Sequence, residues 1–486
     1  MTRARQGMHT MHTHDEDRPA EPAGIEITEL IPILSNAESS RVDAAGTRPR
    51  DTGPLDADPL DIGARWVGEI QAGDRFADTV LLREPHHHTR ARLLVRDGTA
   101  VRGFIDVGVE SGTVLGREVT REAARLPAAP PAPAAAAAPP VSVVVCTRDR
   151  TRELTRVVDS LLAMDYPEFE VVIVDNAASS LDTWRYVDAH HDPRLRVVNA
   201  SVPGLAAARN RGLEEARHGV VAFTDDDVIV DRHWLRCLSR PFADPAVGCV
   251  TGLVPAAQLH TTAQVVFEQR VGWSSSISRR TYAIADGGVH GALFPFRVAD
   301  YGTGANFAVR RATAFELGGF DEALGAGSPT KGGEDIDWFV RTLVGGYTLV
   351  FEPDAITWHQ HRTDDGALLS QAHGYGLGLG AWLTKVAMDR QLAPLAWSRS
   401  GSALRHLVVS VGARSRPVGT AATGPVQVHR TVAGAGREEI TGLMAGPRAL
   451  LTARAQGRKA APFRSFAALP PIVAAVGSPG STSSSQ

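Results

Sequence analysis

The stretch that decides the fold is GVVAFTDDD, residues 219–227, in which an apolar run ends abruptly in three carboxylates. Consecutive apolar residues are typical of a strand buried on both faces of a parallel sheet. Side chains two apart on a strand point the same way, so we expect Asp225 and Asp227 to face one point and Asp226 to face elsewhere. Neighbouring ionised carboxylates repel one another, and a divalent cation relieves that repulsion. The stretch therefore predicts a metal site, with a solvated acidic turn as the alternative.

Strands and helices alternate around this stretch. Apolar, strand-like runs occupy residues 141–145, 169–174 and 195–198, and apolar residues recur at helical spacing after the first of them. Alternation of this kind is the signature of a parallel sheet with right-handed crossovers. The sequence therefore predicts an α/β fold class, with a mainly parallel, Rossmann-like sheet flanked by helices.

Polar side chains follow three of the expected strands at the point where each strand ends. They are Thr147 and Asp149 after the first strand, Asp175 after the second, and the acidic residues 225–227. Parallel sheets bind their ligands at the carboxyl ends of the strands, so these groups should converge on one rim. That convergence favours a combined metal and nucleotide site over a solvated turn.

Two common phosphate-binding motifs are absent from the sequence. No GxGxxG follows the first strand, which disfavours a dinucleotide-binding Rossmann domain, and no GxxxxGK[ST] loop occurs. The glycine-rich run at residues 374–380 lacks the spacing of a phosphate loop and has no strand before it. We expect this run to be a small-residue face for close helix packing.

A second acidic segment, GGEDID at residues 332–337, opens an expected helix. Acidic residues at a helix start are favoured by the positive end of the helix dipole. One carboxylate would satisfy that requirement, and three in four positions exceed it. We therefore expect one of them to take a proton from an incoming hydroxyl.

The segment WHQH, residues 358–361, has strand-like spacing that places His359 and His361 on one face. A buried histidine is commonly structural. Next to an acidic metal site, it is equally suited to complete the coordination. Both interpretations remain open from the residues alone.

Eight segments in fixed order resemble a bacterial family 2 glycosyltransferase of the inverting type with a GT-A fold: VSVVVCTRDR, VVIVDNA, PGLAAARNRGL, VAFTDDD, GTGANFAVRRA, GGFDE, GGEDIDWF and WHQH. The resemblance covers roughly residues 141–385. It implies a nucleotide-diphosphate-sugar donor (UDP-, GDP- or dTDP-linked), Mn²⁺ or Mg²⁺ as cofactor, and an acceptor that is a glycan, a lipid or a small molecule. The QxxRW motif of processive synthases is absent, which puts repeated polymerisation in doubt.

The resemblance also assigns roles by position. Donor binding falls on Thr147, Asp149, Asp175, Arg209, Asp225 and Asp226. Metal binding falls on Asp225 and Asp227, which match the DXD motif, and on His359. Catalysis falls on Asp335 as the base, with Glu334 beside it.

Differences in composition along the chain predict six segments. We expect a disordered tail (1–60), a small β-rich domain (61–125), a Pro/Ala linker (126–140), the GT-A domain (141–385), a helical, basic C-terminal region (386–470) and a flexible tail (471–486). The basic C-terminal region either lies on anionic lipid or packs on the domain as a solvated helix. The aromatic-rich residues 256–300 either shape the acceptor side or pack in the core.

Net charge, cysteine content and the pattern of apolar residues limit the expected partners and cellular location. The chain has 486 residues and a formal net charge of −3, which gives no indication of nucleic acid as a partner. Its three cysteines suit a reducing cytoplasm, and neither a signal peptide nor ~18 uninterrupted apolar residues are present. We therefore expect a cytoplasmic protein with possible peripheral contact at the inner face of the cell membrane.

The expected function is metal-dependent transfer of a sugar, with inversion, to an acceptor hydroxyl in cell-envelope polysaccharide, glycolipid or glycoconjugate synthesis. Two alternatives remain at this point. One is a sugar-nucleotide nucleotidyltransferase, and the other is a non-catalytic sugar-binding GT-A protein.

Overall fold

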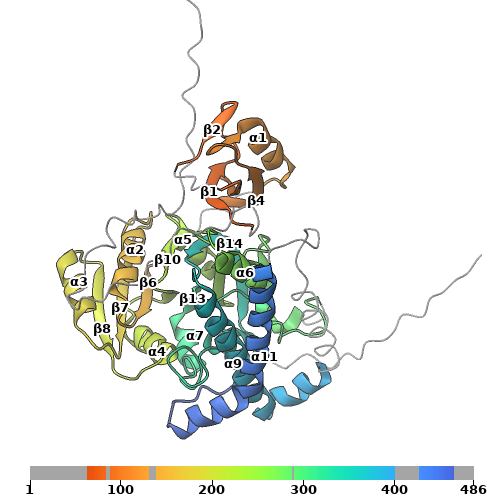
Figure 1. The fold of residues 1–486 in the computed structure, drawn as a ribbon. Coiled ribbons are helices and arrows are strands. Elements are labelled where there is room, and N and C mark those ends of the chain that lie inside the picture. Colours follow the sequence, from red (N-terminus) through yellow and green to blue (C-terminus); the bar gives the residue numbers. More distant parts are fainter. Residues whose placement is uncertain (1–62, 84–87, 131–137, 287–288, 400–425, 465–486) are drawn as a thin grey trace, which may run out of the picture.

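A nine-stranded mixed sheet forms the centre of the molecule, in the order β10-β14-β11-β13-β9-β6-β7-β8, with β12 paired to β14 (Figure 1). The computed structural model describes residues 63–83, 88–130, 138–286, 289–399 and 426–464. The strands of this sheet are β6 (Val141–Thr147), β7 (Phe169–Asn176), β8 (Leu195–Ala200), β9 (Val220–Thr224), β10 (Val228–Val230), β11 (Val247–Leu253), β12 (Arg280–Tyr282), β13 (Asn306–Arg310) and β14 (Thr348–His359).

Four neighbouring strands, β8, β7, β6 and β9, run parallel, as the alternating pattern predicts. All eight residues of β7 are buried, which explains its nearly continuous apolar sequence. The other half of the sheet is mixed: β13 lies antiparallel between β9 and β11, and β10 and β12 run antiparallel to β14. The predicted α/β class is confirmed, and the antiparallel strands are an addition that the pattern did not predict.

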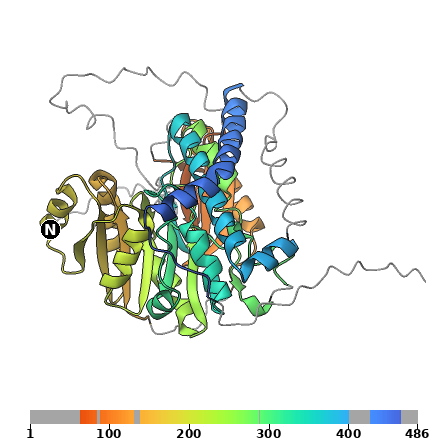
Figure 2. The same ribbon diagram turned by 90° about the horizontal axis from the view of Figure 1, so that it is seen from below.

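Helices cover both faces of the sheet, and the views in Figures 1 and 2 show them on either side of the strands. They are α2 (Thr151–Leu162), α3 (Asp182–His190), α4 (Leu205–Glu215), α5 (Trp234–Ser239), α6 (Thr262–Val271), α7 (Arg311–Glu316) and α8 (Glu334–Val344), with short 3-10 turns η2 (Arg240–Ala243), η3 (Ile284–Asp286) and η4 (Val298–Asp300). Apolar side chains from the two faces of the sheet form two large buried clusters.

A small β module precedes this domain and has a buried core of its own. It consists of β1 (Trp66–Gln71), β2 (Thr79–Leu81), β3 (Arg90–Asp97), β4 (Ala100–Gly108), β5 (Thr113–Leu115) and α1 (Gly116–Arg125). The DG signal at residues 97–98 predicts a hairpin, and β3 and β4 form one, with Asp97 opposite Ala100 and Gly98 at a φ of 60°.

The β module contacts the central domain through charged groups next to β14 (Figure 1). Arg96, only 2% exposed, forms an ion pair of 2.6 Å with Asp231. The backbone N–H of Val101 donates to Asp354 over 2.8 Å. The backbone N–H of Arg65 donates to the Leu259 carbonyl oxygen over 2.8 Å, and Val67, Leu94 and Val101 pack in the core of the domain, so polar and apolar contacts together hold the module in place. The tails at 1–60 and 471–486 and the linker centre at 131–137 lie outside the described residues.

Two long helices close the molecule at its C-terminal side, α9 (Asp365–Met388) and α11 (Val426–Ala455), and Figure 2 shows α11 in blue lying against α9. The helical region begins at Asp365, earlier than the sequence indicates, because packing overrides the low helix propensity of five glycines. The expected domain boundary at residue 385 lies inside α9. In the described ranges every helix is too short or too polar to cross a lipid bilayer.

Two glycines of the run at residues 374–380 lie on the face of α9 against which α11 packs, as predicted for close helix packing. A Cβ at Gly376 would overlap the carbonyl oxygen of Glu439, and one at Gly380 would overlap that of Leu443. The helix backbones approach so closely that only glycine fits at these two positions. Gly374, on the same helix, has its nearest neighbour atom 3.7 Å from an added Cβ.

This difference predicts opposite effects for two identical substitutions. Gly376→Ala should lower the free energy of unfolding by roughly 1–3 kcal/mol, because the methyl group forces the two helices apart. Gly374→Ala should leave it unchanged or raise it by up to about 1 kcal/mol, since alanine favours the helix. Urea unfolding of both variants measures the difference. Equal effects would show that the α9–α11 contact is not tight in solution.

The basic residues at the end of α11 bind the protein itself. Arg454 donates to both oxygens of Asp321 over 2.7 and 2.6 Å, and Arg458 donates to the carbonyl oxygen of Pro203 over 2.8 Å. Arg464 donates to the carbonyl oxygen of Glu316 over 2.9 Å. These contacts favour the packed helix over the lipid-bound one, and membrane contact stays a prediction.

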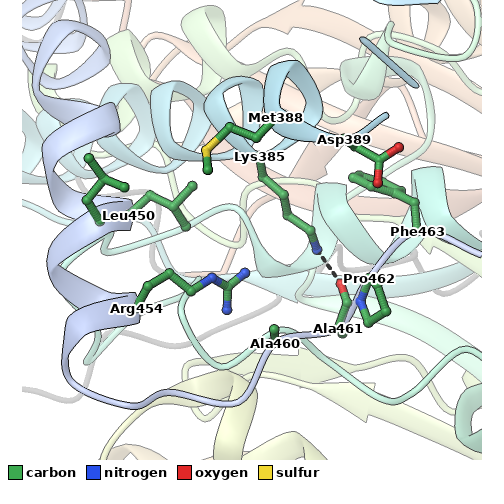
Figure 3. A pocket seen from close by; sticks show the side chains of 10 residues that line it. Lys385, Met388, Asp389, Leu450, Arg454, Ala460, Ala461, Pro462 and Phe463 are labelled. Carbon is green, nitrogen blue, oxygen red and sulfur yellow. Dashed lines mark hydrogen bonds between the residues drawn. The ribbon is translucent and has the colours of Figure 1, made fainter. Parts of the chain in front are cut away.

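Lys385 of α9 connects the C-terminal helices to the core. Its ammonium group lies 2.8 Å from Asp321 and 2.7 Å from Asp337 of α8, and both carboxylates are fully buried. It also donates over 2.7 Å to the carbonyl oxygen of Ala461, beside a largely apolar cavity of about 200 Å³ between α9, α11 and residues 460–463 (Figure 3). The lysine thereby joins three separate segments of the chain.

Candidate active site

The carboxyl ends of the parallel strands lie level with one another. Thr147 of β6 pairs with Asp175 of β7, and Val145 of β6 pairs with Thr224 at the end of β9. The polar residues that follow these strands therefore share one edge of the sheet. The N-terminus of α8, with its own carboxylates, reaches the same edge through Arg209.

Arg209 of α4 is the centre of this cluster and is only 2% exposed. Its guanidinium donates to Glu334 over 2.9 Å and to the carbonyl oxygen of Gly304 over 2.9 Å. It also lies 3.5 Å from Asp225. One buried cation thus holds the acidic turn after β9 next to the acidic start of α8.

The three aspartates after β9 point in directions that differ from the prediction. Strand pairing ends at Thr224, and residues 226–227 form a turn into β10, so strand alternation no longer applies. Asp226 accepts from the Thr147 hydroxyl over 2.7 Å and from Arg150. Asp227 lies 3.2 Å from the same Arg150. Asp226 and Asp227 share one arginine, while Asp225 faces Arg209, so strand alternation does not set these contacts. A metal ion shared by Asp225 and Asp227 stays a prediction.

The acidic side chains carry shifted pKa values. Exclusion of water and the charges of Asp227 and Asp226 raise the pKa of Asp225 to about 8, against the opposing effect of Arg209. Burial also raises the pKa of Asp226 to about 6. Burial and the neighbouring Asp335 raise the pKa of Glu334 to about 7. Burial is the main cause of all three shifts, and it acts against the neighbouring arginines.

Asp335 is one of the partly accessible carboxylates of this cluster, with Asp225. It is half-buried, and its two oxygens accept from the backbone N–H groups of Gly304 over 2.9 Å and Ile336 over 2.8 Å. Glu334 beside it is 5% exposed and bound to Arg209. Of the two carboxylates, Asp335 is thus the one that an acceptor hydroxyl can reach.

His359 ends β14 next to Asp227, with its Nε2 atom 3.5 Å from a carboxylate oxygen. Its Nδ1 atom lies 2.9 Å from Nδ1 of His361, and Nε2 of His361 lies 2.9 Å from Glu268. The two histidines share a face, as predicted. Burial lowers the pKa of His359 to about 4, so the ring is neutral near pH 7.

Asp149 and Asp175, which are expected to bind the donor nucleotide, follow and end the strands β6 and β7 at this edge. Asp149 is exposed, has a φ of 53°, and accepts from the backbone N–H of Ser179 over 2.8 Å. Asp175 is 2% exposed, and among the described residues one of its oxygens has no hydrogen-bond partner. Burial and the charge of Asp149 raise the pKa of Asp175. A buried acceptor without a donor is what a base or a ribose hydroxyl would satisfy.

The donor set suits Mn²⁺ or Mg²⁺ at an open site. Carboxylate oxygens and an imidazole nitrogen are ligands that these ions take, and the raised pKa of Asp225 marks a place where a cation would relieve repulsion. Within the described residues no three His, Cys, Asp or Glu side chains group closely enough to hold an ion alone. The remaining ligands would come from phosphate oxygens and water.

Several side chains at this edge were not singled out in the sequence. Arg150 binds Asp226 and Asp227, and Arg362 lies 3.8 Å from Asp227. Arg150 lies in the turn after the first strand, and a basic residue next to the expected phosphates could have been predicted from the sequence to belong to the site. Glu268 gave no signal, because its partner His361 is 93 residues away.

Comparison with known proteins shows which family the central domain resembles. Residues 142–302 match the model of "Glycosyl transferase family 2". The chain is 29% identical over 272 residues to the pre-mycofactocin glycosyltransferase of Mycobacterium tuberculosis, which covers 56% of this chain and 53% of the relative. The chain carries a family 2 glycosyltransferase domain.

Two further proteins are similar to the chain. The chain is 28% identical over 223 residues to the succinoglycan biosynthesis protein ExoM of Rhizobium meliloti, a match that covers 44% of this chain and 65% of the relative. A solved mannosyltransferase from Pyrobaculum calidifontis, PcManGT in complex with GDP-Man and Mn²⁺, aligns over 65% of this chain and 86% of its own with 20% identity and a TM-score of 0.39. The chain spans about half the length of the M. tuberculosis relative.

Proposed function

We propose that the glycosyltransferase domain transfers a sugar from a nucleoside-diphosphate sugar to an acceptor hydroxyl, with inversion at the anomeric carbon and with a divalent cation. The observation that carries the proposal is the position of Arg209, which holds Asp225 of the acidic turn beside the carboxylates that open α8. Donor phosphates at the acidic turn would then place the sugar next to Asp335.

Asp335 serves as the general base. Its oxygens are held by two backbone N–H groups, so the carboxylate is fixed in orientation before substrate binds. An aspartate with an ordinary pKa near 3.9 is a weak base for an alcohol. Proton transfer becomes favourable as the C–O bond forms, because the hydroxyl acidifies during the displacement.

The departing diphosphate requires positive charge. A divalent ion held by Asp225, Asp227 and His359 would, when bound, stabilise the negative charge that develops on that diphosphate. Arg150 and Arg362 face the same turn and supply charge from the protein. Arg150 must release Asp226 or Asp227 to reach the donor, so donor binding should change its partners.

The nucleoside would lie toward Asp175, whose unpaired buried oxygen suits a base N–H or a ribose hydroxyl. Asp149 borders the same position. The similarity to a succinoglycan biosynthesis protein supports a growing glycan or glycolipid as acceptor. The aromatic residues between 256 and 300 contribute mainly to packing, since Phe267, Tyr282 and Phe294 are each at most 4% exposed.

The function is tested first by its products. A thermal-shift panel of UDP-, GDP- and dTDP-sugars with Mn²⁺ identifies the donor, and turnover of that donor should release a nucleoside diphosphate. Formation of pyrophosphate from a triphosphate would indicate a nucleotidyltransferase instead. Absence of both transfer and slow donor hydrolysis would leave a sugar-binding protein, and retention of anomeric configuration in the product would contradict inversion.

Asp227→Ala should weaken metal-dependent binding of the nucleoside diphosphate by about tenfold or more, which is ~1.4 kcal/mol, because a charged ligand to the ion is lost. Isothermal titration with and without Mn²⁺ measures the effect. Asp159→Ala serves as a control, since that side chain is 74% exposed on α2. Unchanged Mn²⁺-dependent binding in Asp227→Ala would remove Asp227 from the metal site.

A further inference from the structure

A small pocket of about 60 Å³ adjoins the candidate active site. Its lining comes from the loop between α6 and β12, from β12 itself, from the residues before β13 and from β14. It includes Trp273, Arg280, Thr303 and Phe351. This volume holds a few water molecules or one carboxylate or phosphate group, and it is too small for a whole sugar ring. The pocket is therefore suited to a small polar group of a larger ligand.

Two residues of the lining connect the pocket to the candidate active site. Thr303 lines the pocket, and the next residue, Gly304, donates its backbone N–H to Asp335 over 2.9 Å. The ring of Trp273 also lines the pocket and packs edge-on against the ring of His359, with 5.4 Å between the ring centroids. The pocket thus borders residues that touch the proposed base and the expected metal ligand.

Arg280 supplies a cation to the pocket. Its guanidinium lies over the ring of Phe351, 4.9 Å from the centroid. Within the described residues this guanidinium forms no ion pair and donates no hydrogen bond, and its Nε atom is buried without a partner. The preceding Arg279, by contrast, pairs with Glu352 over 3.5 Å. A buried N–H without an acceptor from the protein is costly unless a ligand or water accepts from it.

The charge of the lining favours an anion over water at this position. Asp300 is the other charged residue among the described residues that line the pocket. Its carboxylate pairs with Arg297 over 2.9 Å, and Arg297 lies outside the lining. The charge of Asp300 is therefore offset from outside, while the charge of Arg280 is not.

We propose that this pocket binds an anionic group of the acceptor, a carboxylate or a phosphate, through the guanidinium of Arg280. The planar fork of an arginine donates two parallel hydrogen bonds to either group. The hydroxyl of Thr303 accepts from the backbone N–H of Ala305 over 3.0 Å, so its own hydrogen is available to the same anion. The proposal rests on the proposed function, because it names the class of acceptor that would meet Asp335.

Two sources of the anion fit this chemistry. A uronic acid residue of a glycan offers a carboxylate, and a phosphorylated or lipid-linked sugar offers a phosphate. In either case the anion fills the pocket and the sugar ring stays outside it, where the ring of Trp273 offers an apolar face. The shared requirement is a negative charge on the acceptor at a fixed position.

The first measurement compares three probes that carry the same sugar ring: methyl glucoside, methyl glucuronide and the phosphate monoester of methyl glucoside. Ligand-observed NMR titrations are made with Mn²⁺ and the nucleoside diphosphate selected by the thermal-shift panel. The unaltered protein should bind one or both anionic probes about 10- to 100-fold more tightly than methyl glucoside, because hydrogen bonds between charged groups are the stronger ones.

The preferred probe identifies the source of the anion. Tighter binding of the glucuronide assigns a uronic acid residue, and tighter binding of the phosphate ester assigns a phosphorylated or lipid-linked acceptor. Equal binding of all three probes, as expected for a pocket that holds only water, would overturn the proposal. Binding of none of them would overturn it as well.

The second measurement repeats the titrations on variants. Arg280→Met should remove most of the preference for the anionic probes, and Arg280→Lys, which keeps the charge, should lose less. Arg279→Met is the control, since this neighbouring side chain is 45% exposed and paired with Glu352, and it should keep the full preference. Binding of the nucleoside diphosphate with Mn²⁺ checks that each variant is folded. A preserved preference in Arg280→Met, or equal losses in Arg280→Met and in either Arg280→Lys or Arg279→Met, would overturn the role of the Arg280 charge.

The outcomes separate this proposal from the proposed function. Donor turnover together with an unchanged anion preference in Arg280→Met would overturn the pocket assignment and leave the transferase proposal intact. Absence of donor binding and turnover in the unaltered protein would overturn the proposed function. A preference that is lost in Arg280→Met would then show an anion site for another ligand, which overturns its assignment to an acceptor.

Discussion

Asp335→Asn should lower kcat by about 10²–10⁴-fold while the Kd of the donor changes little, because the amide cannot take the proton of the acceptor hydroxyl. The substitution is nearly isosteric. The amide oxygen can keep the hydrogen bond from Gly304 N–H, which is 2.9 Å long in the structure. The fold and the donor site should therefore survive, and the loss should appear in the chemical step alone.

Two measurements check this expectation. Initial rates at saturating donor give kcat, and titration with the non-hydrolysed nucleoside diphosphate and Mn²⁺ gives binding. A variant with near-normal kcat would remove Asp335 from the role of base. A variant with normal thermal stability but lost donor binding would place the carboxylate on the donor instead of the acceptor.

Arg209→Met should lower the free energy of unfolding by about 3–5 kcal/mol, because it leaves Glu334 and Asp225 without the buried cation between them. Methionine retains much of the side-chain volume, so loss of charge dominates over loss of packing. Transfer activity should fall as well, since the acidic turn and the start of α8 lose their connection.

The same helix supplies the control. Arg211 is 41% exposed and pairs with Glu214 and Glu215 at the surface, so Arg211→Met should change stability by about 1 kcal/mol or less. Glu334→Gln added to Arg209→Met should recover part of the loss, because it removes one uncompensated charge. A loss below about 1 kcal/mol in Arg209→Met would show that the pair is not buried in solution.

Much of the fold followed from local pattern. The apolar strands, the helices between them, the hairpin at Asp97 and Gly98, and the glycine face of α9 each depend on residues close together in the sequence. The antiparallel strand β13 did not follow, because its apolar residues look the same in either direction. The early start of α9 was missed since glycine disfavours helices in isolation.

The sequence predicted which residue types lie at the site better than it predicted the directions of their side chains. Strand ends and their carboxylates could be placed on one edge from the alternating pattern. The directions of Asp226 and Asp227 could not, because the strand stops at Thr224 and a turn sets them. Glu268 depends on a contact across 93 residues, and no local rule connects it with His361.

The cluster of Lys385 with Asp321 and Asp337 has a consequence for shortened forms of the protein. Asp337 lies two residues after Asp335 on α8, and its charge is balanced by Arg341 and by a lysine from α9 that also holds the chain at Ala461. Asp321 receives its second cation, Arg454, from α11. Removing α11 would therefore take one of the two cations from the buried Asp321 and leave Lys385 shared between Asp321 and Asp337 of the helix that carries the proposed base. A shortened form that lacks α11 should accordingly be less stable in the domain that carries the proposed site.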